Sequence, residues 1–181
     1  MELFDVLTAD GRKTGLTKER SAVHRDGDWH GSVHIWVFRR GKVLLQRRAA
    51  GKDSYPLCLD AGCTGHIDAG EDALSAAVRE VSEEIGLKIT PDRLQRLFCE
   101  PITDRAPGFI SNEHNTVFLL MGDVDPAALT RQEEEVDALL WMDAGELLTA
   151  LREGRVKTCI RTARYERVLR EAGKYMDLPQ P

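Results

Sequence analysis

Residues 65–87 read GHIDAGEDALSAAVREVSEEIGL, a turn-rich segment that leads into an amphipathic helix. Asp72 is a residue type that caps helix N-termini, and Gly86 is a type that follows helix C-termini, so a helix is predicted between them. At about 100° per residue, one narrow apolar stripe runs along this helix and is predicted to face a core. The stripe consists of Leu74, Val78, Val81 and Ile85.

Three glutamates, Glu80, Glu83 and Glu84, fall on the opposite side of the predicted helix. Their spacing brings the carboxylates within reach of one small site, where like charges would repel by a few tenths of a kcal/mol per pair. A divalent cation would relieve that repulsion, and hard oxygen ligands suit Mg²⁺ or Mn²⁺. The alternative for three glutamates taken alone is an acidic face exposed to solvent.

The loop before the helix favours the metal site. Gly65 has no side chain, so its carbonyl can approach a metal closely. Arg79 is placed to pair with Glu71 and so to tie the loop to the helix, which is a structural role.

These positions together resemble the signature of the Nudix hydrolases. The signature is Gly, five residues, Glu, seven residues, then Arg-Glu-apolar-any-Glu-Glu-any-Gly-apolar. It is matched at every fixed position, by Gly65, Glu71, Arg79, Glu80, Val81, Glu83, Glu84, Gly86 and Leu87. The resemblance implies an α/β/α sandwich with a mixed β-sheet.

The rest of the chain agrees with an α/β class. We expect a single domain over residues 1–181, with a core at about 32–172 and N-terminal strands and a loop at 1–31. Within 1–31, residues 1–15 form two short strands around a turn and 16–31 form the loop. Further strands are predicted at 32–39, 42–47, 58–64, 94–102, 114–121 and 138–142, and further helices at about 143–151 and 158–172.

Composition narrows the class of protein. The chain is 42% hydrophobic and 30% charged with a net charge of −5, which argues against a general nucleic-acid binder. The four cysteines form no C-x-x-C pair and no disulfide framework. No signal segment or long apolar run is present, so we expect a cytoplasmic protein that does not enter a membrane. A homodimer, common among similar proteins, is left open.

Cations lie in the segment that precedes the signature. Arg47, Arg48 and Lys52 are placed to bind a diphosphate beside the metal site. The alternative is a solvated strand end.

Part of the chain is also similar to the type I isopentenyl-diphosphate isomerases and their hydrolase relatives. The shared features include the run from His24 to His30, the Gly65-His66 pair and Asn112-Glu113. The resemblance implies a metal site at His24, His30, His66 and Glu113, and diphosphate binding by Arg48 and Lys52.

Two departures count against isomerase activity. An isomerase needs a cysteine immediately before the Gly-His pair, where this chain has Thr64. Cys63 lies one residue earlier, and one residue along a strand moves a side chain to the opposite face. A second acidic ligand, two residues before Glu113, is replaced by Ser111.

The sequence therefore predicts a Mg²⁺- or Mn²⁺-dependent hydrolase that cleaves a diphosphate linkage. The substrate would be a nucleoside di- or triphosphate derivative, or a related small pyrophosphate, and Glu80, Glu83 and Glu84 would be the catalytic groups. The general base stays open between Glu83, Glu84 and a loop glutamate among Glu133, Glu134 and Glu135. Alternatives are an isopentenyl-diphosphate isomerase and a non-catalytic nucleotide sensor. Four aromatic residues could stack on a base or belong to the core: Trp36, Phe109, Phe118 and Trp141.

Overall fold

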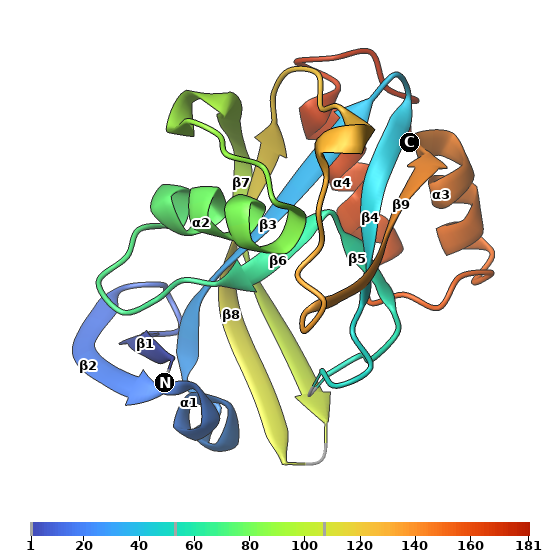
Figure 1. Cartoon of the computed structure of the whole chain (residues 1–181). Helices are drawn as coiled ribbons and strands as arrows, with labels where there is room; N and C mark the ends of the chain where they lie inside the picture. The colour runs from blue at the N-terminus through green and yellow to red at the C-terminus, as the bar shows by residue number, and fades with distance from the viewer. Residues whose placement is uncertain (1, 53, 107) are drawn as a thin grey trace.

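The computed structural model describes residues 2–52, 54–106 and 108–181 of the chain, and its strands form one mixed sheet between helices (Figure 1). The strands are β1 (Leu3–Leu7), β2 (Lys13–Glu19), β3 (Trp29–Arg39), β4 (Lys42–Arg48), β5 (Leu59–Ala61), β6 (Cys63–His66), β7 (Leu94–Ala106), β8 (Phe109–Leu120) and β9 (Val136–Asp143). The helices are α1 (Arg20–Asp26), α2 (Ala73–Ile85), α3 (Ala144–Arg152) and α4 (Thr162–Ala172), with short 3-10 turns η1 (Pro91–Arg93) and η2 (Pro126–Ala128).

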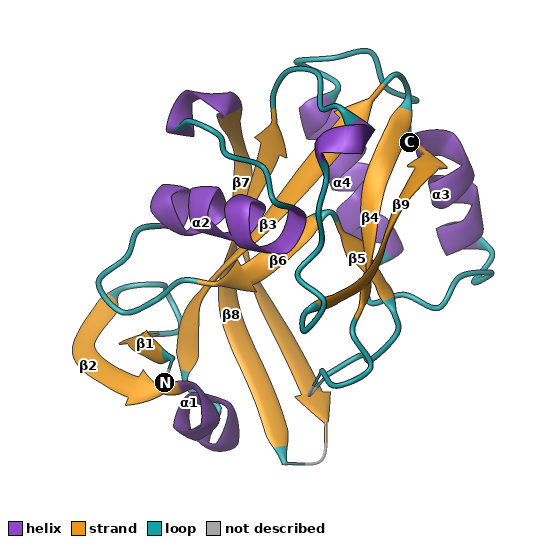
Figure 2. Cartoon of the chain, in the orientation of Figure 1, coloured by secondary structure: helices purple, strands orange, loops and turns teal. Residues whose placement is uncertain are grey.

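Helix α2 covers one face of the sheet, and helices α3 and α4 cover the other (Figure 2). Successive side chains of a strand point to opposite faces, so β3 supplies both cores. Its Ile35 and Val37 pack on the α2 side, whereas Trp36 and Phe38 pack on the α3 and α4 side. Strands β3 and β8 are parallel, and the other strand pairs of the described chain are antiparallel. The predicted α/β/α sandwich with a mixed sheet is confirmed.

Strand β3 creates the space for the site because β4 and β6 pair with different parts of it. Ser32 lies opposite His66 of β6, while Phe38 lies opposite Val43 of β4. Strands β4 and β6 therefore separate from one another, and the Gln46 amide bridges the gap by donating to the Thr64 hydroxyl at 3.1 Å. Side chains from the loop after β4, from β6 and from α2 meet in this gap.

Two local predictions were wrong. The expected loop over residues 16–31 contains the end of β2, helix α1 and the start of β3. Helix α1 has only seven residues and ends at Gly27 with a φ of 72°, so its sequence is too short to show helical periodicity. The single strand expected over 58–64 is two short strands, β5 and β6, that pair with different neighbours.

Helix α2 begins and ends where the sequence predicts, and it buries a wider face than the predicted stripe, of which only Leu74 is exposed. The Asp72 carboxylate accepts hydrogen bonds from the backbone N–H groups of Leu74 and Ser75, both at 2.9 Å. Val81 is fully buried as expected, whereas Leu74 is 37% exposed. The small side chains of Ala76 and Ala77, also fully buried, let the helix approach the sheet closely.

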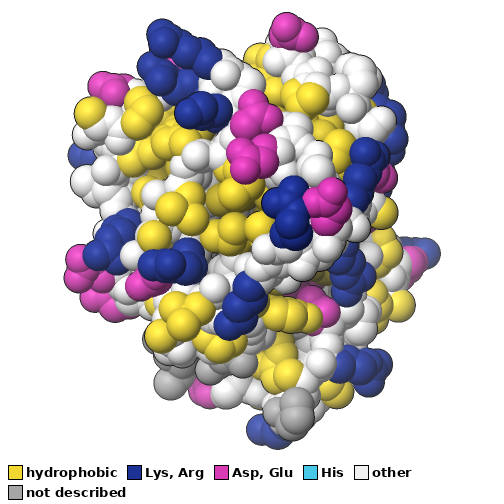
Figure 3. All heavy atoms as spheres, turned by 90° about the vertical axis from the view of Figure 1, so that its right-hand side faces the viewer, with side chains coloured by type: hydrophobic (Ala, Val, Ile, Leu, Met, Phe, Trp, Pro, Cys, Tyr) yellow, Lys and Arg dark blue, Asp and Glu magenta, His cyan; other side chains and the backbone are white. Residues whose placement is uncertain are grey.

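On the face that Figure 3 shows, Lys and Arg side chains are interspersed with Asp and Glu rather than gathered into one basic surface. None of the helices in the described part of the chain is long and apolar enough to cross a bilayer.

Candidate active site

Two of the three signature glutamates are buried against strand β6. Glu80 is 8% exposed and Glu84 is 3% exposed, while the Glu83 side chain is half exposed. A Cβ atom on Gly65 would lie 2.0 Å from Oε1 of Glu80, so only glycine fits between this strand and the helix. The predicted proximity of Gly65 to the glutamates is thus present in the structure.

The surroundings of these carboxylates disfavour their charged forms. Burial raises the pKa of Glu80 to about 7, and burial together with the neighbouring charge of Glu80 raises that of Glu84 to about 8. Oε2 of Glu84 accepts from the Thr64 N–H at 2.8 Å and from the Gln46 amide at 3.1 Å. These two donors orient the carboxylate, and a bound cation would stabilise its ionised form.

Arg79 joins the loop to the helix, as predicted, and it also reaches the signature glutamates. Its Nη2 donates to Oε2 of Glu71 and to the His66 carbonyl, both at 2.9 Å. Its Nη1 donates to Glu80 at 2.7 Å and to Glu83 at 3.1 Å. The contact with Glu83, four residues beyond Arg79 on the same helix, was not predicted, although this spacing places the two side chains side by side.

These groups line a cavity of 620 Å³ that extends from α2 across the sheet to α4. Arg48 and Lys52 lie in its wall, and their side chains are 14% and 16% exposed. Nη2 of Arg48 donates to the Ser54 carbonyl at 3.0 Å, and Lys52 pairs with Glu135, which also lines the cavity. The structure therefore brings two predicted diphosphate ligands to the same space as the glutamates.

Arg47 does not join them. It lies between Gln46 and Arg48 on a strand, so its side chain points to the other face of β4. It pairs there with Asp137 and is absent from the described residues that line the cavity. The structure gives no support to Arg47 as a substrate ligand.

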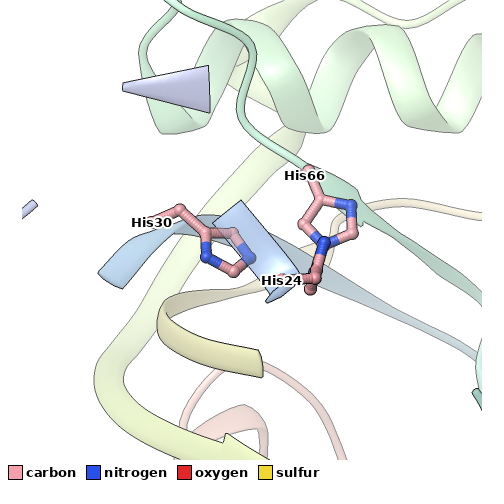
Figure 4. Close-up of side chains that lie close together, drawn as sticks. All are labelled: His24, His30 and His66. Atoms are coloured by element: carbon pink, nitrogen blue, oxygen red, sulfur yellow. The ribbon is translucent and has the colours of Figure 1, made fainter. Parts of the chain in front are cut away.

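The histidines predicted from the isomerase resemblance converge beside the cavity. His24 from α1, His30 from β3 and His66 from β6 each offer a ring nitrogen within 4.8 Å of the others (Figure 4). The Nε2 atoms of His24 and His30 are buried without a hydrogen-bond partner among the described residues. Burial lowers the pKa of all three imidazoles, most strongly that of His66, which favours the neutral form that binds metals.

Glu113 extends this histidine cluster toward the cavity. Its Oε1 lies 3.9 Å from Nε2 of His66 and accepts from the Ser111 hydroxyl at 2.6 Å. Its Oε2 accepts from the Ser32 hydroxyl at 2.5 Å. His66 and Glu113 line the cavity, so the cluster touches the same space as the signature glutamates.

Thr64 and Cys63 point to opposite sides of β6, as the alternation of a strand predicts. Thr64 lines the cavity, whereas Cys63 is fully buried in the core beneath α2. Burial raises the pKa of the Cys63 thiol well above its ordinary value, so the thiol is neither exposed to a substrate nor ionised. All four cysteines are free, in agreement with the absence of a disulfide framework.

The Cys63→Ala variant is expected to keep kcat/KM within about twofold of wild type, because the thiol does not reach the cavity. The free energy of unfolding should fall by about 1 kcal/mol, as for an average core substitution. Steady-state kinetics and urea unfolding measure both effects, with the exposed Cys99→Ala as the matched control. A tenfold loss of kcat/KM in a stably folded variant would contradict this placement of Cys63.

Comparisons with known proteins match most of this chain. The NUDIX domain model matches residues 28–161. The chain belongs to the Nudix hydrolase family. It is 43% identical over 148 residues to Nudix hydrolase 3 of Arabidopsis thaliana, a match that spans 78% of this chain but only 19% of that relative. It is 31% identical over 146 residues to an isopentenyl-diphosphate Delta-isomerase of Escherichia coli O9:H4, covering 79% of this chain and 78% of that enzyme.

Solved structures of this family share the fold. The Deinococcus radiodurans protein DR0079 superimposes with a TM-score of 0.71 at 19% identity, over 92% of this chain and 98% of that protein. An Ap4A hydrolase of C. elegans superimposes with a TM-score of 0.54 at 19% identity, over 80% and 98% of the two chains. At such low identity these matches establish the architecture alone.

Several residues of the cavity wall were missed from the sequence. Asp60, Glu100 and Arg164 reach it from β5, β7 and α4. None of them lies in a motif, so local sequence carries no signal for them. Trp36 and Phe109 line the cavity, whereas Phe118 and Trp141 belong to the α2-side core, so only the first two can face a substrate.

Proposed function

We propose that this protein is a Mg²⁺- or Mn²⁺-dependent hydrolase that cleaves a diphosphate linkage in a nucleoside diphosphate or triphosphate derivative, or in a related small pyrophosphate. The observation that carries the proposal is the pair of buried carboxylates, Glu80 and Glu84, beside Gly65 in a cavity that also contains Arg48 and Lys52. Two buried carboxylates on adjacent turns suit a divalent cation, and buried cations nearby suit phosphate oxygens.

Six residues of the cavity have a proposed part in this reaction. The carboxylates of Glu80, Glu83 and Glu84 and the Gly65 carbonyl would hold the metal, which would supply positive charge against the diphosphate and a lowered pKa for a bound water. Arg48 and Lys52 stabilise the charge that develops on the phosphoryl oxygens. Because the Arg48 guanidinium is anchored on Ser54, little reorganisation is needed when substrate binds.

The general base is best assigned to Glu135 among the loop glutamates. Glu135 lines the cavity and pairs with Lys52. Glu133 instead pairs with Arg131 at 3.0 Å, and Glu134 is exposed. Neither glutamate is among the described residues that line the cavity. The half-exposed Glu83, which already contacts Arg79, is the competing candidate.

The Glu135→Gln variant is expected to lower kcat by about 10²-fold or more, the usual contribution of a positioned base. The acidic limb of the pH–rate profile should disappear with it, because that limb reports the protonation of the base. The matched control is Glu134→Gln in the same loop, which should keep wild-type kinetics. If Glu135→Gln retains kcat within about threefold and the same profile, Glu135 is not the base, and the assignment passes to Glu83 or Glu84.

We also propose that His24, His30, His66 and Glu113 form a second metal centre, since three neutral imidazoles and a carboxylate suit a transition metal. This centre and the isomerase-named relatives favour isopentenyl-diphosphate isomerisation as the second candidate function. The burial of Cys63 outside the cavity weighs against it. The complete carboxylate set likewise weighs against a nucleotide sensor without activity.

The deciding experiment is incubation of the purified protein with Mg²⁺ and a panel of phosphorylated compounds, with phosphate and pyrophosphate release as the readout. The panel contains nucleoside di- and triphosphates, dinucleoside polyphosphates, nucleotide sugars, coenzyme A and isopentenyl diphosphate. Metal-dependent release from any compound supports hydrolysis and identifies the leaving group. Conversion of isopentenyl diphosphate to its isomer without release of phosphate or pyrophosphate would support the second candidate. No reaction with any compound of the panel would support a sensor.

A further inference from the structure

One side of the cavity is lined by three arginines at the start of α4 and within it. Arg161, the N-cap residue, Arg164 and Arg167 are spaced three residues apart and so lie on one side of the helix, and all three line the cavity. Strands β3 and β8 form the cavity floor beneath them. Arg164 reaches this floor at Asn115 of β8, which lies opposite Ser32 of β3.

The two outer arginines are paired with carboxylates. Nη2 of Arg161 lies 3.3 Å from Asp104, and Nη1 of Arg167 donates to Glu100 at 2.8 Å. Arg167 also lies over the ring of Phe98, with 3.9 Å between its Cζ and the ring centroid. Both side chains are also partly exposed, so a carboxylate and solvent together compensate the charge of each.

Arg164 differs from its neighbours. Its side chain is 10% exposed, and its Nη2 donates to the amide oxygen of Asn115, a neutral group. Its Nε has no hydrogen-bond partner in the described structure. It forms a longer ion pair of 3.5 Å with Oε1 of Glu100, a carboxylate whose Oε2 accepts from Arg167. A buried guanidinium with an unused donor is costly unless a ligand completes it.

The other acidic groups near Arg164 are engaged elsewhere. Asp60 lies 3.3 Å from Arg48, and Glu113 accepts from two serine hydroxyls. The cavity wall contains a second unused donor. The indole Nε1 of the fully buried Trp36 also lacks a hydrogen-bond partner among the described residues. Two unpartnered donors, one of them cationic, therefore belong to the wall of one cavity.

We infer that Arg164 and the indole N–H of Trp36 form a subsite for a second oxyanion of the substrate, a phosphate or carboxylate carried in addition to the diphosphate. The inference rests on the proposed function for the reaction at the glutamates. A guanidinium binds such a group more strongly than it binds a neutral carbonyl, because the hydrogen bonds are charge-assisted. Arg164 would therefore select the substrate, while the glutamates carry out the cleavage.

Matched substrate pairs test this subsite. Coenzyme A and 3′-dephospho-coenzyme A, and likewise NADP⁺ and NAD⁺, share a diphosphate and differ by one phosphate. Wild-type kcat/KM should be at least about tenfold higher for the phosphorylated member of a hydrolysed pair. Arg164→Gln should bring that ratio to near one by losing activity on the phosphorylated member alone, and Arg164→Lys should restore part of it.

Two further variants separate recognition from folding. Arg170→Gln removes the same charge from the exposed side of α4 and should keep the wild-type ratio. Trp36→Phe keeps an aromatic ring but removes the indole donor, so it should lower the ratio even if Arg164→Gln does not fold. A wild-type ratio near one, or hydrolysis restricted to compounds without a second anionic group, would overturn the inference while leaving the proposed function intact.

Absence of hydrolysis across the whole panel would instead overturn the proposed function. Calorimetric titration of the metal-free protein with inorganic phosphate then decides the subsite independently. Wild type should bind one phosphate more than Arg164→Gln does, and identical isotherms would overturn the subsite.

Discussion

In the Glu84→Gln variant, kcat on the preferred diphosphate is expected to fall by about 10³-fold or more while the fold persists. Glutamine keeps the shape of the side chain and can still accept the Thr64 N–H that the carboxylate accepts at 2.8 Å. It removes the negative charge needed to hold a divalent cation, whose contribution of several kcal/mol corresponds to this loss of rate. Initial rates across a Mg²⁺ titration measure the effect, and thermal melting followed by circular dichroism reports the fold.

The exposed Glu134→Gln variant provides the control, because it removes one carboxylate outside the cavity. It should keep both kcat and the apparent Mg²⁺ affinity. Full activity of Glu84→Gln at ordinary Mg²⁺ concentrations would remove the signature helix from the mechanism. A loss of activity with a proportionate loss of helical signal would show only that Glu84 is structural.

The metal-free protein is expected to become less stable as the pH rises from about 6.5 to about 8, above the range in which the buried histidines titrate and oppose this trend. The pKa values of Glu80 and Glu84 are raised in the folded state to about 7 and about 8, chiefly by burial. Across this interval the folded protein holds protons that the unfolded chain has released, so the free energy of unfolding falls with pH, by an amount on the order of a few kcal/mol. Urea unfolding in EDTA at several pH values measures this slope.

Two further measurements test whether these two carboxylates cause the fall of the unfolding free energy with pH. Glu84→Gln in EDTA should show a shallower decline than wild type, because one of the two titrating groups is gone. Saturating Mg²⁺ near pH 8 should restore the stability of wild type and leave Glu84→Gln nearly unchanged. A metal-free protein whose stability is constant or increases over this interval would refute the raised pKa values.

Local features of the sequence predicted local structure well. Asp72 and Gly86 mark the ends of α2 because capping depends on residues within one turn of each end. The opposite orientation of Thr64 and Cys63 follows from the alternation of any strand. The same rule separates Arg48 from Arg47, but it does not say which of them faces the cavity.

Features that depend on distant parts of the chain were not predictable in this way. Three closely spaced glutamates are also typical of an acidic surface, yet Glu80 and Glu84 are buried because β6 approaches α2 at Gly65. The sequence predicts a loop where helix α1 supplies His24. This short helix is held by packing against the sheet and not by its own periodicity.

By itself the sequence determined the signature helix, its two ends, the family and the set of groups that can bind a metal and a diphosphate. Each of these depends on spacing within a few turns of chain, which backbone geometry translates directly into position. Only the tertiary structure decided which charges are buried, and that Arg164 lies in the wall of the same cavity with no hydrogen bond at Nε among the described residues. Burial and pairing arise from contacts such as Ser32 with Glu113 and Arg164 with Asn115, which the packing of the whole chain creates.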